Sequence, residues 1–373
     1  MIYLDNAATA RPNGEAVKAA LHFLGKDFYN PSAMYKEGFQ IHREVESARK
    51  NILAKVADIA AFDFIFTSCG SESDNQVIFS CARRGNFVTT LGEHAAIFNS
   101  AADLKRRGVE VRFAKLKNDG SVDEEDLLNL VDANTTLVSV IHVNNETGAI
   151  NDIASIAKKV KMKNPSTVFH SDGVQAFGKI PFRMTAAIDF YSVSAHKIGG
   201  IRGIAGLVRS KKKNLFPLIY GGGQEGGLRG GTENVFAIKQ FEYAAEQKFL
   251  NLEKDLKKVS SLNEIVRAGL DKNLFRILSS EQASPYILSI SAPGLRGETL
   301  MHMINDQGVL VGTGSACSSR NRYSRVILAC GVEERYAEGV LRISFSAENT
   351  EKEVTDAVKI INECAAKLSE SLK

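Results

Sequence analysis

The segment Phe190-Tyr191-Ser192-Val193-Ser194-Ala195-His196-Lys197 joins an apolar, strand-like run to a polar turn that ends in a lysine. A similar junction precedes it, where the run 167–170 leads into Asp172 and Gln175. In open parallel sheets, ligands bind beyond the carboxyl ends of the strands. The two junctions therefore predict neighbouring strands whose polar ends share one edge of a sheet.

The same alternation extends through the first part of the chain. Further strand candidates lie at 62–66, 87–90, 109–113 and 137–143, and stretches with helical spacing lie at 97–107, 124–131 and 153–161. Repeated strand, helix and strand units predict an α/β fold with a mostly parallel central sheet covered on both faces.

The pattern changes after about residue 235. A long helical stretch rich in Lys and Glu runs from there past residue 270 and is expected to be a connector. Strand candidates and two helices follow, the second of them after a capping box formed by Thr350 and Glu353. These strands lie at 287–291, 309–311 and 340–345, and the helices at 298–305 and 351–368. This composition predicts a smaller α/β domain after residue 250.

Composition excludes several classes of protein. The net charge of +4, from 47 basic and 43 acidic residues, is too small to indicate a nucleic-acid partner. The chain meets a charge at Asp5, and no apolar stretch approaches the roughly 18 residues of a membrane helix. The five cysteines are widely spaced and lack a C-x-x-C pair, which argues against disulfides and a metal site. We therefore expect a cytoplasmic protein with no membrane partner.

Four polar clusters follow strand candidates, at 67–72, 144–148, 171–175 and 194–197, and predict one shared site. Gly70 and Ser71 stand where a helix begins, so backbone N–H groups could face a phosphate there. An ordinary serine cap, with Asp74 three residues on, explains the same pattern. Asp172 could pair with a cationic ring nitrogen, or it could be a helix cap.

Several other polar residues have both a chemical and an ordinary interpretation. Gln175 and Asn145 are amides that could reach an anionic oxygen, or that could satisfy the backbone of their loops. Lys197 could form a Schiff base in a desolvated pocket, or be a surface charge. His94 could stack on a planar ring, and Arg342 could clamp a carboxylate from its strand, although an exposed strand arginine is the ordinary case.

Two further segments are rich in small residues. The glycine-dense stretch 221–232 carries Arg229 and Thr232, which could meet an anion unless the stretch is a flexible surface loop. Gly314-Ser315-Ala316-Cys317 places a cysteine among small polar residues and near Arg320, whereas Cys81, Cys330 and Cys364 sit in helical, apolar contexts. Such surroundings suit an accessible, reactive thiolate.

In these motifs the chain resembles the cysteine desulfurases of the class V aminotransferase family, in the subgroup with a Gly-Ser-Ala-Cys loop. The resemblance spans nearly the whole chain. It is carried by Tyr3-Leu4-Asp5-Asn6-Ala7-Ala8-Thr9, Asn30-Pro31-Ser32, Glu93-His94, Asn144-Asn145-Glu146-Thr147-Gly148, residues 172–176, His196-Lys197, Gly230-Gly231-Thr232-Glu233-Asn234, Gly314-Ser315-Ala316-Cys317 and Arg342.

The resemblance implies a homodimer with the aspartate aminotransferase-like fold and pyridoxal 5'-phosphate as cofactor. It implies a large cofactor-binding domain at 13–250 and a small domain at 1–12 and 251–373. Lys197 would form the Schiff base, His94 would stack on the ring, Asp172 would pair with its nitrogen and Gln175 would contact its phenolic oxygen. The phosphate would be held by Gly70, Ser71, Ser194 and His196, with Thr232 reaching it from the neighbouring subunit.

The resemblance also implies a reaction. Asn145 and Arg342 would grip the carboxylate of L-cysteine, Lys197 would move its α-proton, and Cys317 would take the sulfur as a persulfide while alanine leaves. The sulfur would pass to an acceptor protein, either an iron–sulfur scaffold or a tRNA-thiolating enzyme.

Some positions depart from the family pattern. Gly226 replaces an arginine, Ala10 replaces a threonine, Tyr29 stands where glycine is common, and the segment 320–323 is altered and one residue shorter. A selenocysteine lyase or another lyase on the same scaffold is the nearest alternative. A catalytically idle sulfur-carrier or partner-binding subunit is a second one, although the joint presence of the candidate catalytic residues argues against it.

Overall fold

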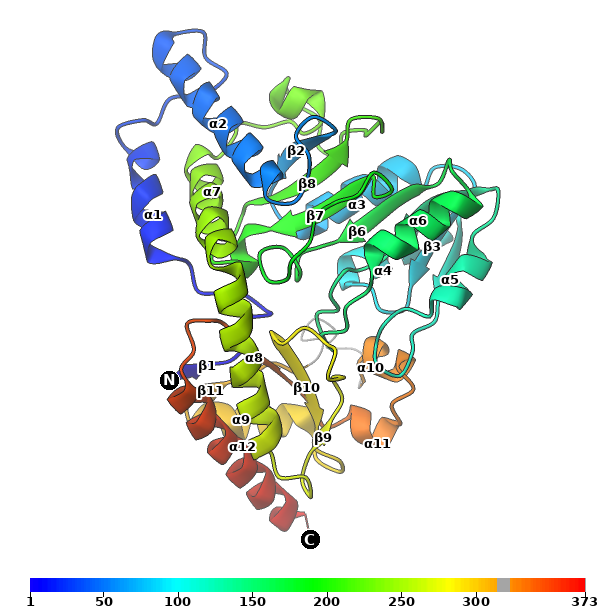
Figure 1. Cartoon of the computed structure of the whole chain (residues 1–373), viewed down its shortest axis with the longest axis vertical. Coiled ribbons are helices and arrows are strands. Elements are labelled where there is room, and N and C mark those ends of the chain that lie inside the picture. The colour runs from blue at the N-terminus through cyan, green and yellow to red at the C-terminus, as the bar shows by residue number, and fades with distance from the viewer. Residues whose placement is uncertain (314–322, 373) are drawn as a thin grey trace.

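The computed structural model describes residues 1–313 and 323–372. A large part is built on a seven-stranded sheet and a small part on a three-stranded sheet, and two helices run end to end between them (Figure 1). The seven strands, in spatial order, are β2 (Phe62–Thr67), β8 (Ala205–Ser210), β7 (Phe190–Ser194), β6 (Val168–Asp172), β5 (Thr135–Ser139), β3 (Asn86–Thr90) and β4 (Glu110–Ala114).

The central sheet is mostly parallel, as the alternation of strands and helices predicted. The exception is β8, which runs antiparallel to both β2 and β7. Gly206 on this strand lies against Phe64, and a Cβ there would fall 1.9 Å from the Phe64 ring. Glycine weakens the usual apolar pattern of a strand, so the sequence did not predict β8.

Helices cover both faces of this sheet. One core contains buried residues of α2 (Lys36–Ala54), α6 (Ile153–Lys163) and α7 (Val235–Leu250). The other core contains those of α3 (Gly70–Cys81) and α4 (Ala95–Arg106). The remaining elements of this part are α1 (Gly14–Ala20), α5 (Glu124–Leu130) and the 3-10 helices η1 (Leu21–Leu24), η2 (Ala195–Lys197) and η3 (Gln224–Gly227). Burial on both faces explains the apolar strand sequences.

The small part has its own core. Its antiparallel sheet contains β12 (Val340–Ser344), β10 (Ile287–Ser291) and β9 (Arg276–Ile277). The helices packed there are α8 (Leu252–Gly269), α9 (Gly297–Asp306) and α12 (Glu351–Ser371), and two short ones follow the undescribed segment, α10 (Arg325–Ala329) and α11 (Glu334–Ala337). The predicted capping box of Thr350 and Glu353 is present at the start of α12.

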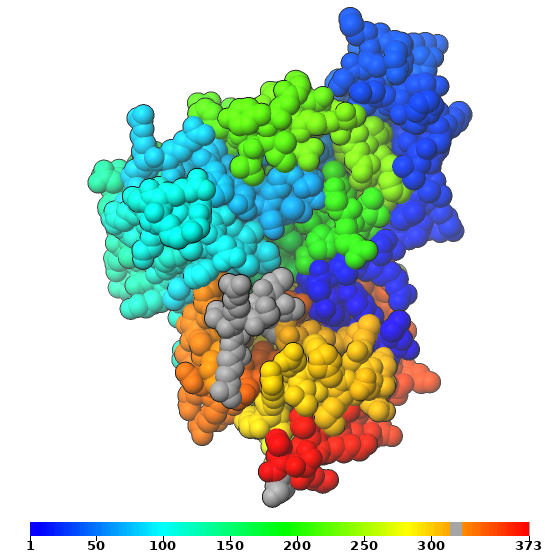
Figure 2. All heavy atoms as spheres, turned by 180° about the vertical axis from the view of Figure 1, so that it is seen from behind, coloured from blue at the N-terminus to red at the C-terminus, as the bar shows by residue number. Residues whose placement is uncertain are grey.

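The N-terminus also belongs to this region. β1 (Ile2–Tyr3) pairs in parallel with β11 (Val309–Leu310), and Asp5 bridges to Ser344. In Figure 2 the start of the chain, in blue, appears at the junction of the green and yellow regions, while another blue segment projects at the top. Residues directly after β1 are thereby held beside the carboxyl edge of the large sheet.

One predicted element differs in the structure. The long helical stretch expected from about residue 235 past residue 270 is divided into α7 and α8 at Asn251, whose backbone is not helical. The helix expected to begin at the small residues Gly70 and Ser71 does begin at Gly70, with Cys69 as its cap residue. Within the described parts of the chain, no helix has both the length and the apolar character needed to cross a membrane.

Candidate active site

A cavity of about 490 Å³ opens at the carboxyl edge of the large sheet. Its walls include residues from all four polar loops that the sequence predicted to converge, and from the N-terminal segment and β12. The predicted site residues that line it are Gly70, Ser71, His94, Asn145, Asp172, Gln175, Ser194, His196, Lys197 and Arg342. One cavity therefore contains ten of the predicted residues.

Lys197 ends the 3-10 turn that follows β7. Its Nζ atom donates hydrogen bonds to the backbone carbonyl oxygens of Ala7, at 2.6 Å, and Ala8, at 2.8 Å. The side chain is half-buried and lines the cavity. The amine is thus held in the site by the N-terminal segment and is not a plain surface charge.

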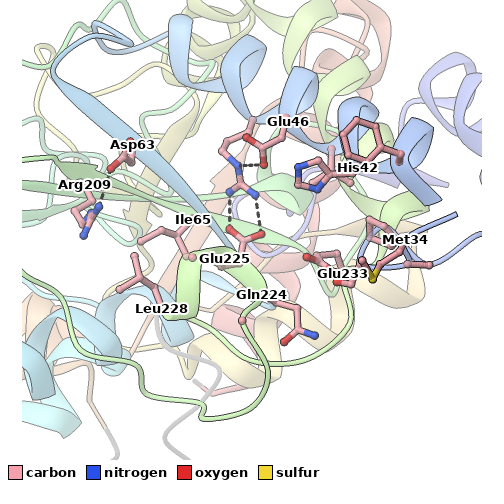
Figure 3. Close-up of a pocket in the computed structure, with 18 residues that line it drawn as sticks. Met34, His42, Glu46, Asp63, Ile65, Arg209, Gln224, Glu225, Leu228 and Glu233 are labelled. Carbon is pink, nitrogen blue, oxygen red and sulfur yellow. Dashed lines mark hydrogen bonds and ion pairs between the residues drawn. The ribbon is translucent and has the colours of Figure 1, made fainter. Parts of the chain in front are cut away.

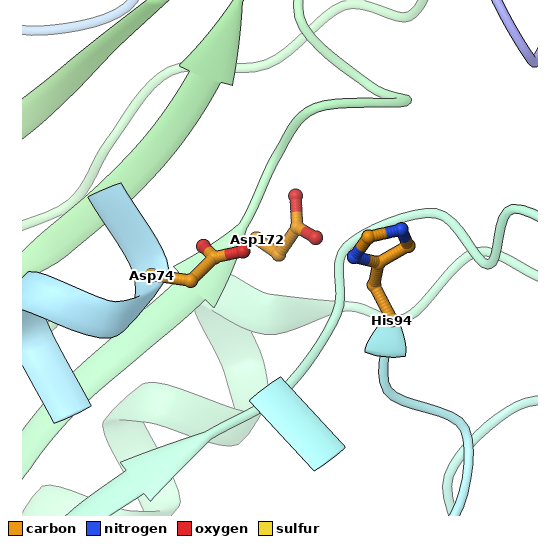
Figure 4. A group of neighbouring side chains, drawn as sticks. All are labelled: Asp74, His94 and Asp172. Atoms are coloured by element: carbon orange, nitrogen blue, oxygen red, sulfur yellow. The ribbon is translucent and has the colours of Figure 1, made fainter. Parts of the chain in front are cut away.

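Asp172 and His94 face each other across the inner end of the cavity (Figure 4). Asp172 ends β6, and its Oδ1 atom accepts a hydrogen bond from the N–H of Val174 at 2.9 Å. His94 caps α4, and its Nδ1 atom accepts from the N–H of Ala96 at 3.2 Å. Burial lowers the pKa of His94, although Asp172 opposes the shift, so the imidazole is neutral at neutral pH.

Gln175 lies beside this pair and is almost fully buried. Its Nε2 atom donates to the carbonyl oxygen of Ala7 at 2.9 Å, and its Oε1 atom accepts from Nζ of Lys179 at 2.9 Å. Burial lowers the pKa of Lys179 well below its usual range, and the charge of Lys197 adds to the effect. The two contacts orient the amide with its donor group towards the N-terminal segment.

The start of α3 forms another wall. A Cβ at Gly70 would lie 2.8 Å from the Val174 side chain and 3.9 Å from that of Ser194, so glycine permits the close approach of the loops. Ser194 Oγ is buried and has no hydrogen-bond partner among the described residues. His196 contacts Thr9 through Nδ1 at 3.2 Å, and burial together with the charge of Lys197 lowers its pKa to about 4.

Arg342 approaches from the small part. Its guanidinium donates to the carbonyl oxygen of Asn145 and to Oδ1 of Asp5, both at 2.9 Å, and its side chain is only 8% exposed. The Nε atom is buried without a partner among the described residues. The alternative interpretation, an exposed strand arginine, is therefore excluded, and the cavity receives a fixed cation suited to a carboxylate.

Four other charged residues, for which no motif predicted a site role, also line the cavity: Asp74, Glu93, Glu146 and Arg325. Burial raises the pKa of Glu93 to about 8. Burial also raises the pKa of Glu146, whose Oε2 atom accepts from Ser324 at 2.5 Å. The motifs contain Glu93 and Glu146 next to predicted residues, but nothing local indicated their burial.

Two predicted residues are not placed in this cavity. Thr232 is exposed and lines a separate, smaller cavity with Ser68 and Arg229, and Arg229 pairs with Glu72 at 3.0 Å. Cys317, the predicted nucleophile, lies outside the described residues.

A second cavity, of about 1060 Å³, lies between α2 and the glycine-dense segment (Figure 3), and Lys197 is not in its wall. Arg49 on α2 donates to both carboxylate oxygens of Glu225, at 2.5 and 2.9 Å, and Glu225 also accepts from the N–H of Phe66 at 2.8 Å. None of the predicted site residues that the structure describes lines this cavity. Its ion pair ties the glycine-dense segment to the sheet.

The side chains that line the cavity around Lys197 match the groups that pyridoxal phosphate needs. It offers an amine, a carboxylate, a neutral imidazole and an amide, which the ring and its aldehyde need. At its other wall, the unpartnered Ser194 Oγ lies beside a helix start, and helix N-termini favour phosphate groups.

Comparison with known proteins settles the family. The model for "Aminotransferase class-V" matches residues 2–356. The chain belongs to the class-V aminotransferase family. It is 33% identical to a cysteine desulfurase of Trichormus azollae, over 99% of this chain and 94% of that protein. It is 36% identical to the cysteine desulfurase IscS of Anaeromyxobacter sp. (strain K), over 99% and 93%.

Solved structures agree with this assignment. A NifS-like protein superposes with a TM-score of 0.91 at 34% identity, covering 98% of this chain and all of the other. A NifS-like protein from Rickettsia africae superposes with a TM-score of 0.90 at 30% identity, covering 98% and 99%. The predicted fold is thus confirmed for this class-V aminotransferase.

Proposed function

We propose that this class-V aminotransferase is a cysteine desulfurase, which converts L-cysteine to L-alanine and leaves the sulfur as a persulfide on Cys317. The observation that supports it best is the convergence of Lys197, Asp172 and Arg342 on one cavity. Full-length similarity to cysteine desulfurases supports the same reaction.

The proposed cofactor is pyridoxal 5'-phosphate. Asp172 would hold its ring nitrogen, His94 would stack on the ring and Gln175 would hold the phenolic oxygen. Gly70, Ser71, Ser194 and His196 would hold the phosphate, with Thr232 of a second subunit. When bound, the group supplies an electron sink for the α-carbon of an amino acid.

The protein's own residues would perform the remaining tasks. Arg342 and Asn145 would bind the substrate carboxylate, because the guanidinium is already fixed by Asp5 and by the Asn145 carbonyl. Lys197 would move the α-proton of the substrate. The thiolate of Cys317 would attack the substrate sulfur, so that the S–S bond forms as the carbon–sulfur bond breaks, and alanine carries away the proton.

We also propose a homodimer. Met34 and Phe39 lie in the wall of the cavity beside α2 and are 101% and 58% exposed, and Phe28, earlier in the same segment, is 69% exposed. Exposed apolar groups of this kind mark interfaces, and a second copy seated there would cover them. The sulfur acceptor would be another protein, of iron–sulfur assembly or tRNA thiolation, in a reducing cytoplasm that suits the spaced thiols. The division into 13–250 and 1–12 with 251–373 is part of this proposal.

The test is to determine which cysteine carries the sulfur taken from the substrate. After addition of L-cysteine, mass spectrometry of the purified protein should find one added sulfur atom on Cys317, and the alanine formed should equal the sum of this bound sulfur and the sulfide released. Cys69 is a sharp comparison, because among the described cysteines it is exposed and lines the same cavity. Persulfide should form in Cys69→Ser and not in Cys317→Ser. Turnover without sulfur on Cys317, or no turnover with cofactor bound, contradicts the proposal.

A further inference from the structure

A second carboxyl group lies beside Asp172. Asp74 is on α3, is 1% exposed, and has an oxygen within 4.8 Å of side-chain atoms of both Asp172 and His94 (Figure 4). Its Oδ1 atom has no hydrogen-bond partner among the described residues, although the residue lines the cavity. Two buried carboxylates this close repel each other strongly when both are ionised.

The groups around Asp74 do not supply a balancing cation. His170 on β6 lies behind it, with Nε2 3.5 Å from Asp74 Oδ1, and the ring is held by Ser139 at 2.8 Å and Ser192 at 3.0 Å. Burial lowers the pKa of His170 to about 3, so this imidazole is neutral at neutral pH. The other titratable groups that face Asp74 are Glu93 and Cys69, which are acids, and His94.

Asp172 has a different environment. Burial raises the pKa of Asp172 too, but its carboxylate accepts the backbone N–H of Val174, and the positive charge of Lys197 opposes the shift. The Val174 N–H and the Lys197 amine thus stabilise a charge on Asp172, whereas the group nearest to Asp74 Oδ1 is the neutral ring of His170, at 3.5 Å. A single proton shared by the two carboxyl groups is therefore more stable on Asp74 than on Asp172.

We propose that Asp74 is a positioning residue, a neutral carboxylic acid that leaves one negative charge on the pair and places that charge on Asp172, facing the cavity. The inference deepens the proposed function and rests on it for the pairing of Asp172 with a cofactor nitrogen. Burial, followed by repulsion from Asp172, raises the pKa of Asp74 well above its usual range, in agreement with the geometry.

The first test measures charge on the full-length protein. Asp74→Asn replaces a carboxylic acid by its neutral isostere, so native gel electrophoresis at neutral pH should leave the variant level with the parent protein. Asp306→Asn is the control, because Asp306 is exposed at the end of α9 and its loss should shift the protein by one charge. A one-charge shift for Asp74→Asn overturns the proposal.

The second test follows the His94 ring by NMR during a pH titration of the cofactor-free full chain. Asp172→Asn should lower the pKa of His94, because Asp172 is the carboxylate that raises it, whereas Asp74→Asn should leave it unchanged. An equal lowering by both variants overturns the proposal. A purely structural role for Asp74 would not produce this difference.

The third test uses the parent protein alone, so it does not depend on whether a variant folds. With carbon-13 label in the aspartate carboxyl groups, the infrared spectrum of the parent protein should retain a protonated aspartic acid band at neutral pH, and absence of the band overturns the proposal. None of these readouts requires turnover. A protein that shows the neutral Asp74 but no desulfurase activity supports this inference and contradicts the proposed function alone.

Discussion

Nζ of Lys197 lies 2.6 Å from the carbonyl oxygen of Ala7, across 190 residues of sequence. The Ala7 peptide is itself held by the small part, since its N–H donates to Ser344 Oγ at 2.8 Å. The lysine amine therefore depends on contacts from both parts of the molecule. Under the proposed function, a Lys197 nitrogen bonded to the cofactor would keep at most one N–H, so at least one of the two carbonyl contacts would be lost.

Lys197→Ala should abolish the absorbance of covalently bound cofactor and lower alanine formation by about 10²- to 10⁴-fold, the usual contribution of a positioned acid–base group. Absorbance spectra and an alanine assay check both effects. Lys272→Ala is the matched control, because Lys272 is an exposed lysine in the small part. Full turnover in Lys197→Ala would contradict the role proposed for the lysine amine.

Arg342→Lys should raise the KM for L-cysteine by roughly 10- to 100-fold, with a smaller effect on kcat. The guanidinium can bond Asp5, the Asn145 carbonyl and a carboxylate together, whereas an ammonium group lacks this planar geometry, and a hydrogen bond to a charged group contributes about 1.5–3 kcal/mol. Steady-state kinetics measure KM and kcat separately. Arg335→Lys, at an exposed pair with Glu333, should leave both constants unchanged.

The buried carboxyl group of Glu93 should make the free energy of unfolding depend on pH. Its pKa is raised by burial to about 8 in the folded protein, so the folded state binds a proton that the unfolded state loses above its lower, ordinary pKa. The contribution is complete at low pH and is lost as pH rises towards 8, with a slope of up to about 1.4 kcal/mol per pH unit.

Glu93→Gln should remove this slope from the free energy of unfolding, since the amide oxygen can still accept from Thr90 Oγ1 and the Ile141 N–H. Denaturant unfolding at several pH values between about 5 and 8 measures it. The exposed Glu264→Gln should keep the slope of the parent protein. A slope unchanged in Glu93→Gln would assign the dependence to other groups.

The Arg49–Glu225 pair predicts a large cost for removing one partner. Glu225 is 2% exposed at its side chain, and it holds a backbone φ of 50° that a non-glycine residue adopts only with support. Arg49→Met should lower the free energy of unfolding by about 3–5 kcal/mol, because it leaves a buried carboxylate unpaired.

A double-mutant cycle checks this assignment. Replacing both residues, as Arg49→Met with Glu225→Leu, should cost less than the sum of the two single changes, since no buried charge then remains. Additive losses in urea unfolding would show that the two side chains act independently.

The sequence alone determined the alternation of strands and helices, the capping box of α12 and the four polar loops. These features are local, because they depend on residue period, turn chemistry and caps within a few positions. The parallel arrangement of strands then made convergence of the loops at one edge predictable. Motif resemblance added roles for Lys197, Asp172 and Arg342, and the structure brings these three together in one cavity.

Only the tertiary structure decided which distant groups meet. The contacts of Lys197 with Ala7 and of Arg342 with Asn145 join residues 190 and 197 positions apart, and no local pattern specifies them. The antiparallel β8, the break at Asn251 and the burial of Asp74 likewise depend on packing. Charge and pKa in the site follow from burial and from neighbouring charges, so they emerge when the two parts of the chain pack together.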